Sequence, residues 1–307
     1  FTQRRWYSGI RRVAREAGIR KPILWISRPE LAGALGRFDE CLSIYHVVDE
    51  YGGYTSQDDM TRKELWRAEE ELLDRVDISI VVSEQLLNRK SAPNREVFLV
   101  ENAVDIEKYD ARRIKAIAPE DLATIPGPRL GYSGLIGSRL DLKLLQDLAR
   151  ARPDWSIVLL GKVDNRGCED DIAALNRLSN VYFLGEKPYS EVPDYVLGFD
   201  IGLLPYRINL ETRNISPLKM YEYLAAGAPV VSTDIPAVGN CRDVVDVRNT
   251  AREFEAACAF RLQNDSADDV EKRVAFARCN TWDSRVEQLW QILSSRLNLD
   301  APARAGH

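Results

Sequence analysis

The sequence predicts an α/β fold made of two halves, each built on a parallel sheet with flanking helices. Short β-branched runs alternate with longer amphipathic stretches over most of the chain, which is the pattern of strand–helix units. The composition of the 307 residues, 45% hydrophobic and 29% charged, is that of a globular protein and excludes disordered or collagen-like chains. This length corresponds to two domains of about 100–200 residues each.

The first third of the chain contains strand patterns separated by helical ones. The strands are expected at Ile23–Ser27, Ser43–Val47, Ile78–Val82 and Val97–Val100. Two of the helices between them are expected at Thr61–Leu73 and Glu84–Arg89.

A second series of strand–helix units follows. Its strands are expected at Arg129–Ser133, Ser156–Gly161, Val181–Leu184, Ile201–Pro205 and Pro229–Ser232. Its helices are expected at Asp141–Arg152, Glu169–Leu178, Glu191–Leu197 and Leu218–Ala226. The chain then shows only helical patterns, at Thr250–Leu262, Asp265–Arg278 and Asp283–Leu297.

A domain boundary is expected between Asp105 and Pro128. This segment is charged, lacks a strand pattern and ends in the turn sequence Ile-Pro-Gly-Pro. We therefore assign residues 1–110 and 111–282 to two Rossmann-like domains, and residues 283–307 to a terminal helix that packs back on the first. Ligands of such open sheets bind beyond the C-terminal ends of the strands.

Charge, cysteines and histidines exclude several classes of protein. The net charge of −5 disfavours nucleic-acid binding, which needs a basic surface. The five cysteines are scattered and form no C-x-x-C pair, so a disulfide framework or a zinc cluster is not expected. With two histidines and no D-x-D motif, we expect chemistry without a metal or another cofactor.

The segment 214–234 is the most informative stretch of the chain. We expect Ser216 to cap a helix, Pro217 to occupy its first position and Gly227 to end it. The free N–H groups at the start of such a helix attract an anion. Lys219 and Glu222 lie in the first turns of this helix, where Lys219 could bind a phosphate and Glu222 the diol of a ribose. Alternatively, the two residues form an ordinary surface ion pair at a spacing of three residues.

Two further loops follow expected strands of the second half. Gly131-Tyr-Ser-Gly-Leu-Ile-Gly-Ser-Arg139 has the spacing G-x-x-G-x-x-G, in which Gly134 permits close approach of a ligand and Arg139 can reach a phosphate. A tight turn explains that loop equally simply. In residues 181–189, Tyr189 is either a stacking plane for a base or a packed aromatic.

Polar residues also follow a strand of the first half, at residues 44–51. Asp49 is a candidate general base there. Alternatively, Asp49 caps the next segment and His46 is a core or surface histidine.

Segment 214–234 resembles the donor-binding helix of GT-B glycosyltransferases, in particular the retaining family 4 (group 1). Other motifs follow in the family's order over residues 43–297: Val82-Ser-Glu84, Glu101-Asn-Ala-Val-Asp105, Tyr132-Ser-Gly134, Phe183-Leu-Gly185 and Thr281-Trp282. The resemblance implies that the first domain binds the acceptor and that the second domain binds a nucleoside-diphosphate sugar. We expect the nucleotide to be UDP.

The resemblance also implies roles for single residues. Glu222 matches the second Glu of the family's E-x7-E motif and would bind the ribose, whereas Asn214 replaces the first. Lys219, together with Arg139, would neutralise the diphosphate and act in catalysis, and Asp49 would face the donor sugar. The remaining donor-binding residues would be Gly134, Lys187, Tyr189, Ser216, Pro217 and Leu218.

The implied reaction transfers a sugar to a hydroxyl of a saccharide or glycolipid without a metal, in bacterial cell-surface polysaccharide synthesis. Retaining and inverting stereochemistry both remain open, and an inverting reaction would use Asp49 as base. A non-catalytic sugar-nucleotide-binding subunit and a GT-B nucleotide-sugar epimerase are the alternatives. An NAD-dependent enzyme is disfavoured because G-x-G-x-x-G is absent.

The first 21 residues carry seven basic side chains and one acidic one. An apolar stripe runs among them, formed by Trp6, Tyr7, Ile10, Val13 and Ala17. This stretch is either a basic helix packed on the sheet or a peripheral contact with the inner face of the cell membrane, for a cytoplasmic protein. Because the first half shows few strands, we expect its N-terminal part to be incomplete.

Overall fold

The structure is a computed structural model that describes residues 2–50, 59–113 and 118–297. The chain divides into two compact units. Unit 1 contains residues 1–101, 214–216 and 286–307, and unit 2 contains residues 102–213 and 217–285.

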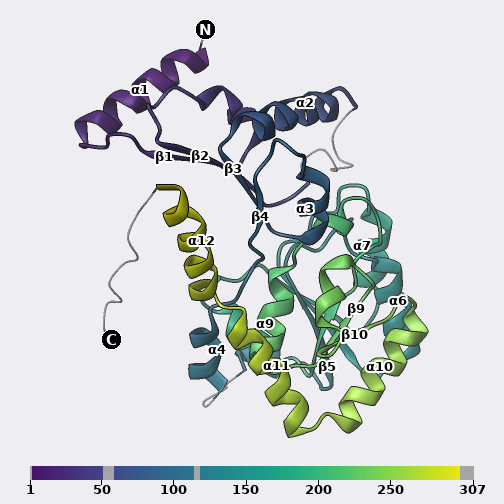
Figure 1. The fold of residues 1–307 in the computed structure, drawn as a ribbon. Coiled ribbons are helices and arrows are strands. Elements are labelled where there is room, and N and C mark those ends of the chain that lie inside the picture. The colour runs from purple at the N-terminus through teal and green to yellow at the C-terminus, as the bar shows by residue number, and fades with distance from the viewer. Residues whose placement is uncertain (1, 51–58, 114–117, 298–307) are drawn as a thin grey trace. The chain divides into compact units, whose positions relative to one another are not determined.

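Unit 1 is built on a four-stranded parallel sheet with strand order β1-β2-β3-β4 (Figure 1). Its strands are β1 (Ile23–Ile26), β2 (Leu42–Val47), β3 (Ile78–Val81) and β4 (Val97–Leu99). The register places Ile44 of β2 beside Trp25 of β1 and Ile78 of β3. The predicted strands of this half are confirmed to within one residue at each end.

Two apolar cores cover the two faces of this sheet, because successive side chains of a strand point to opposite faces. Tyr45 of β2 belongs to one core, together with side chains from α1, α2 and α3. Its neighbour Ile44 belongs to the other, against which Leu289 and Leu293 of the last helix pack. The helices of unit 1 are α1 (Thr2–Glu16), η1 (Pro29–Ala34), α2 (Asp59–Arg75), α3 (Glu84–Lys90) and the part of α12 (Trp282–Leu297) from residue 286 onward.

Unit 2 is built on a six-stranded parallel sheet with strand order β10-β9-β8-β5-β6-β7. Its strands are β5 (Arg129–Ser133), β6 (Ser156–Leu160), β7 (Val181–Gly185), β8 (Ile201–Leu204), β9 (Val230–Ser232) and β10 (Val245–Val247). The sequence pattern located the first five of them and missed β10, which has only three residues.

Two helical layers cover the sheet of unit 2 and lie on either side of it in Figure 1. One layer contains α6 (Leu142–Ala151), α7 (Glu169–Asn176) and α10 (Ala251–Asn264). The other contains α4 (Ile106–Arg113), α8 (Val192–Val196), α9 (Leu218–Ala226) and α11 (Ala267–Cys279). Shorter elements are α5 (Glu120–Ala123), η3 (Thr212–Asn214) and η4 (Pro236–Cys241).

The segment 105–128 is more ordered than the expected linker. It contains α4 and α5, and α4 packs on α8 and α9 of unit 2. The compact units therefore divide after residue 101, where the sequence placed the boundary after residue 110. The physical reason is that α4 finds its apolar partners in the second sheet's helical layer.

The strand order of unit 2 reverses between β5 and β8. From β5 the chain adds β6 and β7 on one side, and it then crosses over to add β8, β9 and β10 on the other. In open parallel sheets the crevice at such a reversal, beyond the C-terminal strand ends, is where ligands bind. Among the described residues, no helix is both long enough and apolar enough to cross a membrane.

Candidate functional site

Three glycines lie at the C-terminal ends of β5, β6 and β7. Gly134, Gly161 and Gly185 have φ angles of +135°, +136° and +70°. The Gly134 N–H donates to the Leu160 carbonyl over 2.8 Å, and the Gly161 N–H donates to the Gly185 carbonyl over 2.8 Å. A Cβ on Gly161 would lie only 2.1 Å from the Gly134 oxygen. Glycine is therefore required at position 161 for the ends of β5 and β6 to lie side by side, and the three glycines expose backbone rather than side chains there.

Helix α9 spans Leu218–Ala226, as the helical pattern predicted, but its cap lies one residue later than expected. Pro217, in extended backbone geometry at φ −74° and ψ 113°, is the N-cap, and it makes no side-chain capping hydrogen bond. The prediction that Ser216 caps the helix was therefore wrong. The predicted end of the helix is confirmed: Gly227 adopts a left-handed conformation at φ 78°, and its N–H donates to the Leu224 carbonyl.

A cavity of about 420 Å³ lies between the start of α9 and the strand ends of unit 2. Six of the predicted donor-binding residues line it, namely Gly134, Lys187, Tyr189, Leu218, Lys219 and Glu222. The sequence analysis did not single out the other lining residues, which are Ser133, Leu135, Leu160, Gly161, Lys162, Glu186 and Val192. Gly161 could have been predicted to line the cavity, because it lies at the end of a strand as Gly134 does.

Lys219 enters the cavity from the first turn of α9. Its ammonium donates a hydrogen bond to the Tyr206 hydroxyl over 3.0 Å. It also lies 5.2 Å from the centre of the Tyr132 ring. The expected surface pair with Glu222 does not form, since the described residues place no carboxylate within ion-pair distance of this ammonium.

Glu222 lies one turn deeper on α9 and is half-buried. Burial raises the pKa of its carboxyl, while the positive charges of Lys219 and Lys108 and a hydrogen bond with Tyr189 act in the opposite direction. The Tyr189 side chain is 62% exposed, and the Lys108 ammonium lies 5.0 Å from its ring centre. This part of the cavity thus combines an acceptor carboxylate with an exposed aromatic plane.

Two other predicted cations are paired with carboxylates. The Lys187 ammonium lies 2.6 Å from Asp121, and this hydrogen bond raises the pKa of Lys187. Arg139 Nε donates to Glu211 over 2.6 Å, and Arg139 is not among the residues that line the cavity.

The remaining predicted donor-binding residues lie elsewhere. Asn214 is buried, with 2% of its surface exposed, and its carbonyl accepts a hydrogen bond from Ser83 Oγ over 3.0 Å. Asn214 and Ser216 belong to unit 1, and Pro217 does not line the cavity.

Asp49, the candidate base, lies just after β2 in unit 1 and accepts a hydrogen bond from the Glu50 N–H over 2.9 Å. Beside it is a buried ion cluster that the sequence did not reveal. The Lys90 ammonium lies 2.9 Å from Glu50 and 2.8 Å from Glu69, and all three side chains are almost fully buried. This cluster fixes the chain where β2 ends.

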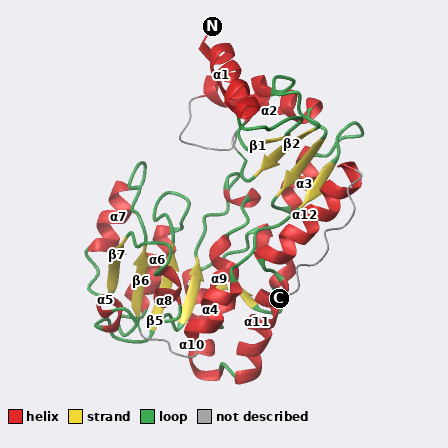
Figure 2. Ribbon diagram, turned by 90° about the vertical axis from the view of Figure 1, so that its left-hand side faces the viewer, coloured by secondary structure: helices red, strands yellow, loops and turns green. Residues whose placement is uncertain are grey.

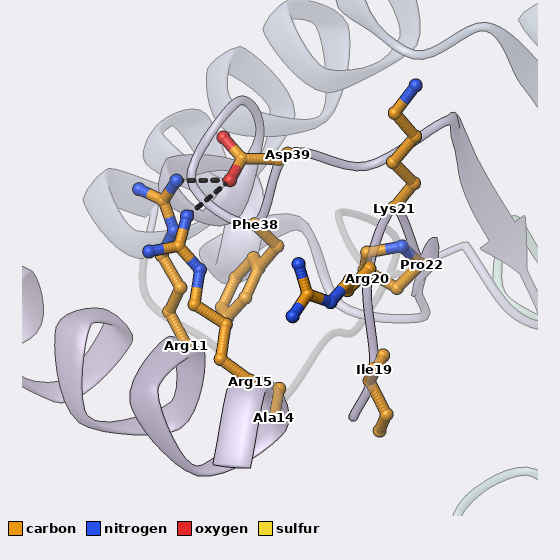
Figure 3. Close-up of a pocket in the computed structure, with 9 residues that line it drawn as sticks. All are labelled: Arg11, Ala14, Arg15, Ile19, Arg20, Lys21, Pro22, Phe38 and Asp39. Atoms are coloured by element: carbon orange, nitrogen blue, oxygen red, sulfur yellow. Dashed lines mark hydrogen bonds and ion pairs between the residues drawn. The ribbon is translucent and has the colours of Figure 1, made fainter. Parts of the chain in front are cut away.

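A second cavity, of about 540 Å³, lies in unit 1 between α1 and the segment before β1 (Figure 3). Arg11 and Arg15 both bind the Asp39 carboxylate, and hydrogen bonds from these two residues lower the pKa of Asp39. Arg20 and Lys21 line the cavity from the following segment, so its rim is basic. Nothing in its lining matches the predicted donor site.

In the described residues, no group of three or more His, Cys, Asp or Glu side chains is arranged to hold a metal ion.

Known proteins resemble both the sequence and the fold. Residues 136–264, which form most of unit 2, match the family described as glycosyl transferases group 1. A Bacillus subtilis protein named as a teichuronic acid biosynthesis glycosyltransferase, TuaH, is 32% identical over 239 residues. That alignment covers 74% of this chain and 59% of TuaH, so the chain spans less than two thirds of this relative.

Solved structures show the same fold at low sequence identity. Anabaena Alr3699/HepE in complex with UDP superimposes with a TM-score of 0.72 at 16% identity, covering 94% of this chain and 82% of that one. The lipopolysaccharide glycosyltransferase WaaG superimposes with a TM-score of 0.62 at 14% identity, covering 94% of this chain and 82% of that one. With its two parallel sheets the chain has the GT-B fold, and residues 136–264 form a domain that matches the group 1 glycosyltransferases.

Proposed function

We propose that this chain carries the donor site of a glycosyltransferase that moves a sugar from a nucleoside-diphosphate sugar to a hydroxyl of a saccharide or glycolipid. The observation that carries the proposal is the cavity at the strand reversal of unit 2. It combines a cation, a carboxylate and an aromatic plane with glycine strand ends. Relatives named for teichuronic acid and lipopolysaccharide synthesis point to a cell-surface polysaccharide as the product.

The cavity assigns one part of the donor to each group. The Lys219 ammonium and the N-terminal turn of α9 meet the diphosphate, whose negative charge grows as the sugar bond breaks. The Glu222 carboxylate accepts hydrogen bonds from the ribose hydroxyls, and the exposed Tyr189 ring stacks on the base. We take the base to be uracil, because the Anabaena protein of this fold was solved with UDP and with UDP-glucose.

The chemistry proposed for these groups needs no metal or cofactor. As the bond between the sugar and the diphosphate breaks, both electrons go to the phosphate oxygen, and the acceptor oxygen forms the new bond to the sugar. In a retaining reaction the departing phosphate takes the acceptor proton; in an inverting reaction Asp49 takes it. Arg139 is paired with Glu211, so we assign the larger share of phosphate neutralisation to Lys219.

A thermal-shift panel tests the donor site. UDP, GDP, ADP, NAD and UDP-glucose are each added at the same concentration, and a ligand at 100 times its Kd stabilises the folded state by about 2.7 kcal/mol. We expect UDP and UDP-glucose to raise the melting temperature and NAD to leave it unchanged. A shift with NAD and none with any nucleoside diphosphate would contradict the proposal.

A product assay with UDP-glucose then separates the remaining possibilities. Release of UDP that depends on a saccharide or glycolipid acceptor supports a transferase. Conversion of the UDP-sugar to an isomer without acceptor would instead indicate an epimerase. Binding without either product would indicate a non-catalytic sugar-nucleotide-binding subunit.

We further propose that the protein is cytoplasmic and contacts the inner face of the cell membrane through α1. Trp6, Ile10 and Val13 follow one another at helical spacing and are 55%, 39% and 59% exposed. Exposed basic side chains accompany them, including Arg12 and Arg20. Apolar side chains flanked by arginines are the combination that binds an anionic lipid surface.

Vesicle sedimentation tests this contact. Binding should appear with vesicles containing phosphatidylglycerol and not with pure phosphatidylcholine. The R12E/R20E variant should weaken it by about tenfold or more, since each basic residue near the surface contributes about 1 kcal/mol. F260S, at a 57% exposed side chain on α10, serves as the matched control. Equal binding to both vesicle types would contradict the membrane contact.

A further inference from the structure

The ammonium of Lys219 is held by aromatic side chains. It donates to the Tyr206 hydroxyl over 3.0 Å, and it lies 5.2 Å from the ring centre of Tyr132 and 5.7 Å from that of Tyr206. Both tyrosines are buried, with 2% and 4% of their surfaces exposed. Aromatic faces attract a cation through their quadrupole, and a phenol oxygen accepts its N–H bond.

This environment leaves the charge of Lys219 unneutralised. Lys187 and Arg139 are each paired with a carboxylate, Asp121 and Glu211 respectively. Within the described ranges, no such partner lies within ion-pair distance of the Lys219 ammonium. A carboxylate there would compete with an incoming phosphate, whereas the Tyr206 phenol oxygen and the Tyr132 ring hold the cation and leave its positive charge available.

Glycine 134 completes the space around the ammonium. A Cβ on Gly134 would lie 2.8 Å from Lys219 Cε and 3.0 Å from Nζ. Any side chain at this position would therefore displace the lysine. The strand end of β5 and the lysine of α9 fit one another because this residue is a glycine.

Tyr206 itself is fixed by backbone pairing on both sides. The Asp141 N–H donates to the Pro205 carbonyl over 2.7 Å, and the Arg207 N–H donates to the Arg139 carbonyl over 2.9 Å. Leu140 and Tyr206 form an antiparallel bridge between these two bonds. The backbone of Tyr206, just after β8, is thus paired with the segment just before α6, and its buried phenol offers Lys219 an acceptor.

We propose that Tyr206 is a positioning residue for the donor diphosphate and acts through Lys219. Its hydroxyl, with the ring face of Tyr132, orients the lysine ammonium over Gly134 and toward the cavity while leaving its charge free for phosphate oxygens. This inference rests on the proposed donor site and adds to it a residue that does not line the cavity. Tyr206 is therefore not assigned any contact with the nucleotide.

Isothermal titration with UDP and with uridine tests this positioning role. The proteins compared are wild type, Y206F, K219M and the Y206F/K219M double variant. Y206F keeps the buried ring and removes the hydroxyl, which accepts from Lys219 and also interacts with the Tyr132 hydroxyl. Y221F, which removes the hydroxyl of another buried tyrosine on α9 itself, is the matched control. Thermal melting of every variant checks that unit 2 is folded.

Y206F should weaken UDP binding by about tenfold, as expected when a hydrogen bond to a charged group is lost, and should leave uridine binding unchanged. K219M should weaken UDP binding at least as much. In the double variant the loss should equal that of K219M alone, because Tyr206 acts only through the lysine.

Three results would overturn the inference. These are wild-type UDP affinity in Y206F, an equal loss of uridine affinity, or a loss that adds in full to that of K219M. If wild type bound none of UDP, GDP or ADP, the donor site itself would be refuted and the role of Tyr206 with it. That outcome is visible in wild type alone, so the two failures are distinguishable.

Discussion

At the residue scale, Glu222 is a carboxylate whose burial disfavours its negative charge. Burial raises the pKa of Glu222, and the nearby cations offset this only in part, so the shift remains upward. Burying a neutral carboxylic acid at this position would cost less free energy than burying a charged carboxylate. The cost makes sense if the charged form is needed to accept hydrogen bonds from a ligand.

This reasoning predicts opposite effects of E222Q on stability and on binding. The pKa of Glu222 is higher in the folded state than in the unfolded state, where it is near 4.5. Its contribution to the free energy of unfolding is therefore present at low pH and is lost as the pH rises from the unfolded-state pKa through the folded-state pKa. E222Q lacks this loss, so urea unfolding should show it more stable than wild type at pH 8 and similar at pH 4.

The same variant should bind UDP about tenfold more weakly, since the neutral amide is a poorer acceptor for ribose hydroxyls. E191Q, at an exposed glutamate that does not line the cavity, is the control for both measurements. Unchanged UDP affinity together with unchanged stability at pH 8 would contradict the role given to Glu222.

At the element scale, the site depends on strand ends that lie unusually close together. The Gly134 N–H donates to the Leu160 carbonyl and the Gly161 N–H donates to the Gly185 carbonyl, and the first turn of α9 lines the same cavity. Figure 2 shows the helices α6, α8 and α9 arranged around these strands. The loops are therefore held by the sheet and do not need to be ordered by a ligand.

We predict that G161A disrupts this arrangement. The added methyl group would lie 2.1 Å from a backbone oxygen at a φ of +136°, and such strain costs of order 1–3 kcal/mol. Urea unfolding should show a loss in this range, with loss of UDP binding. G239A, where nothing lies within 4 Å of an added Cβ, should change little. A G161A protein as stable as wild type would contradict the predicted strain.

The elements that sequence reasoning found and missed differ for physical reasons. The end of α9 could be predicted because Gly227 fixes a left-handed conformation, whereas its cap was placed one residue too early because Pro217 is itself in extended geometry. Strand β10 was missed because three residues carry too little pattern, and α4 was missed because its charged sequence gains its structure from packing on α8 and α9. The role of Tyr206 could not be predicted from the sequence, since its contact with Lys219 depends on the conformation of the loop that follows β8.

At the scale of the whole molecule, two separate sheets form two compact units, each with its own buried residues. The cluster of Lys90, Glu50 and Glu69 belongs to the first, and the donor cavity belongs to the second. Most of the family match falls in unit 2. Several of the motifs that predicted two sheets lie at strand ends, such as Val82-Ser-Glu84 after β3 and Tyr132-Ser-Gly134 at the end of β5.

We predict that K90M destabilises unit 1 selectively. Removing this ammonium leaves the buried Glu69 carboxylate without a counter-charge and leaves Glu50 only the partly exposed Arg89, 3.4 Å away. Breaking a buried ion pair in this way typically costs about 3–5 kcal/mol. Hydrogen exchange should accelerate in β2 and β3 and remain slow in β5 and β6. K143M, which removes an exposed lysine paired with Asp147 on α6, should have little effect. Equal acceleration in both sheets would show that the two units are not independent.

The central claim is that the cavity between α9 and the glycine strand ends binds a nucleoside diphosphate. A crystal structure of the chain with UDP tests it most directly. The account predicts density for the diphosphate beside the Lys219 ammonium and the start of α9, with the ribose hydroxyls at Glu222. UDP bound in any other place, such as the basic cavity beside Arg11 and Arg15, with this one empty, would contradict it.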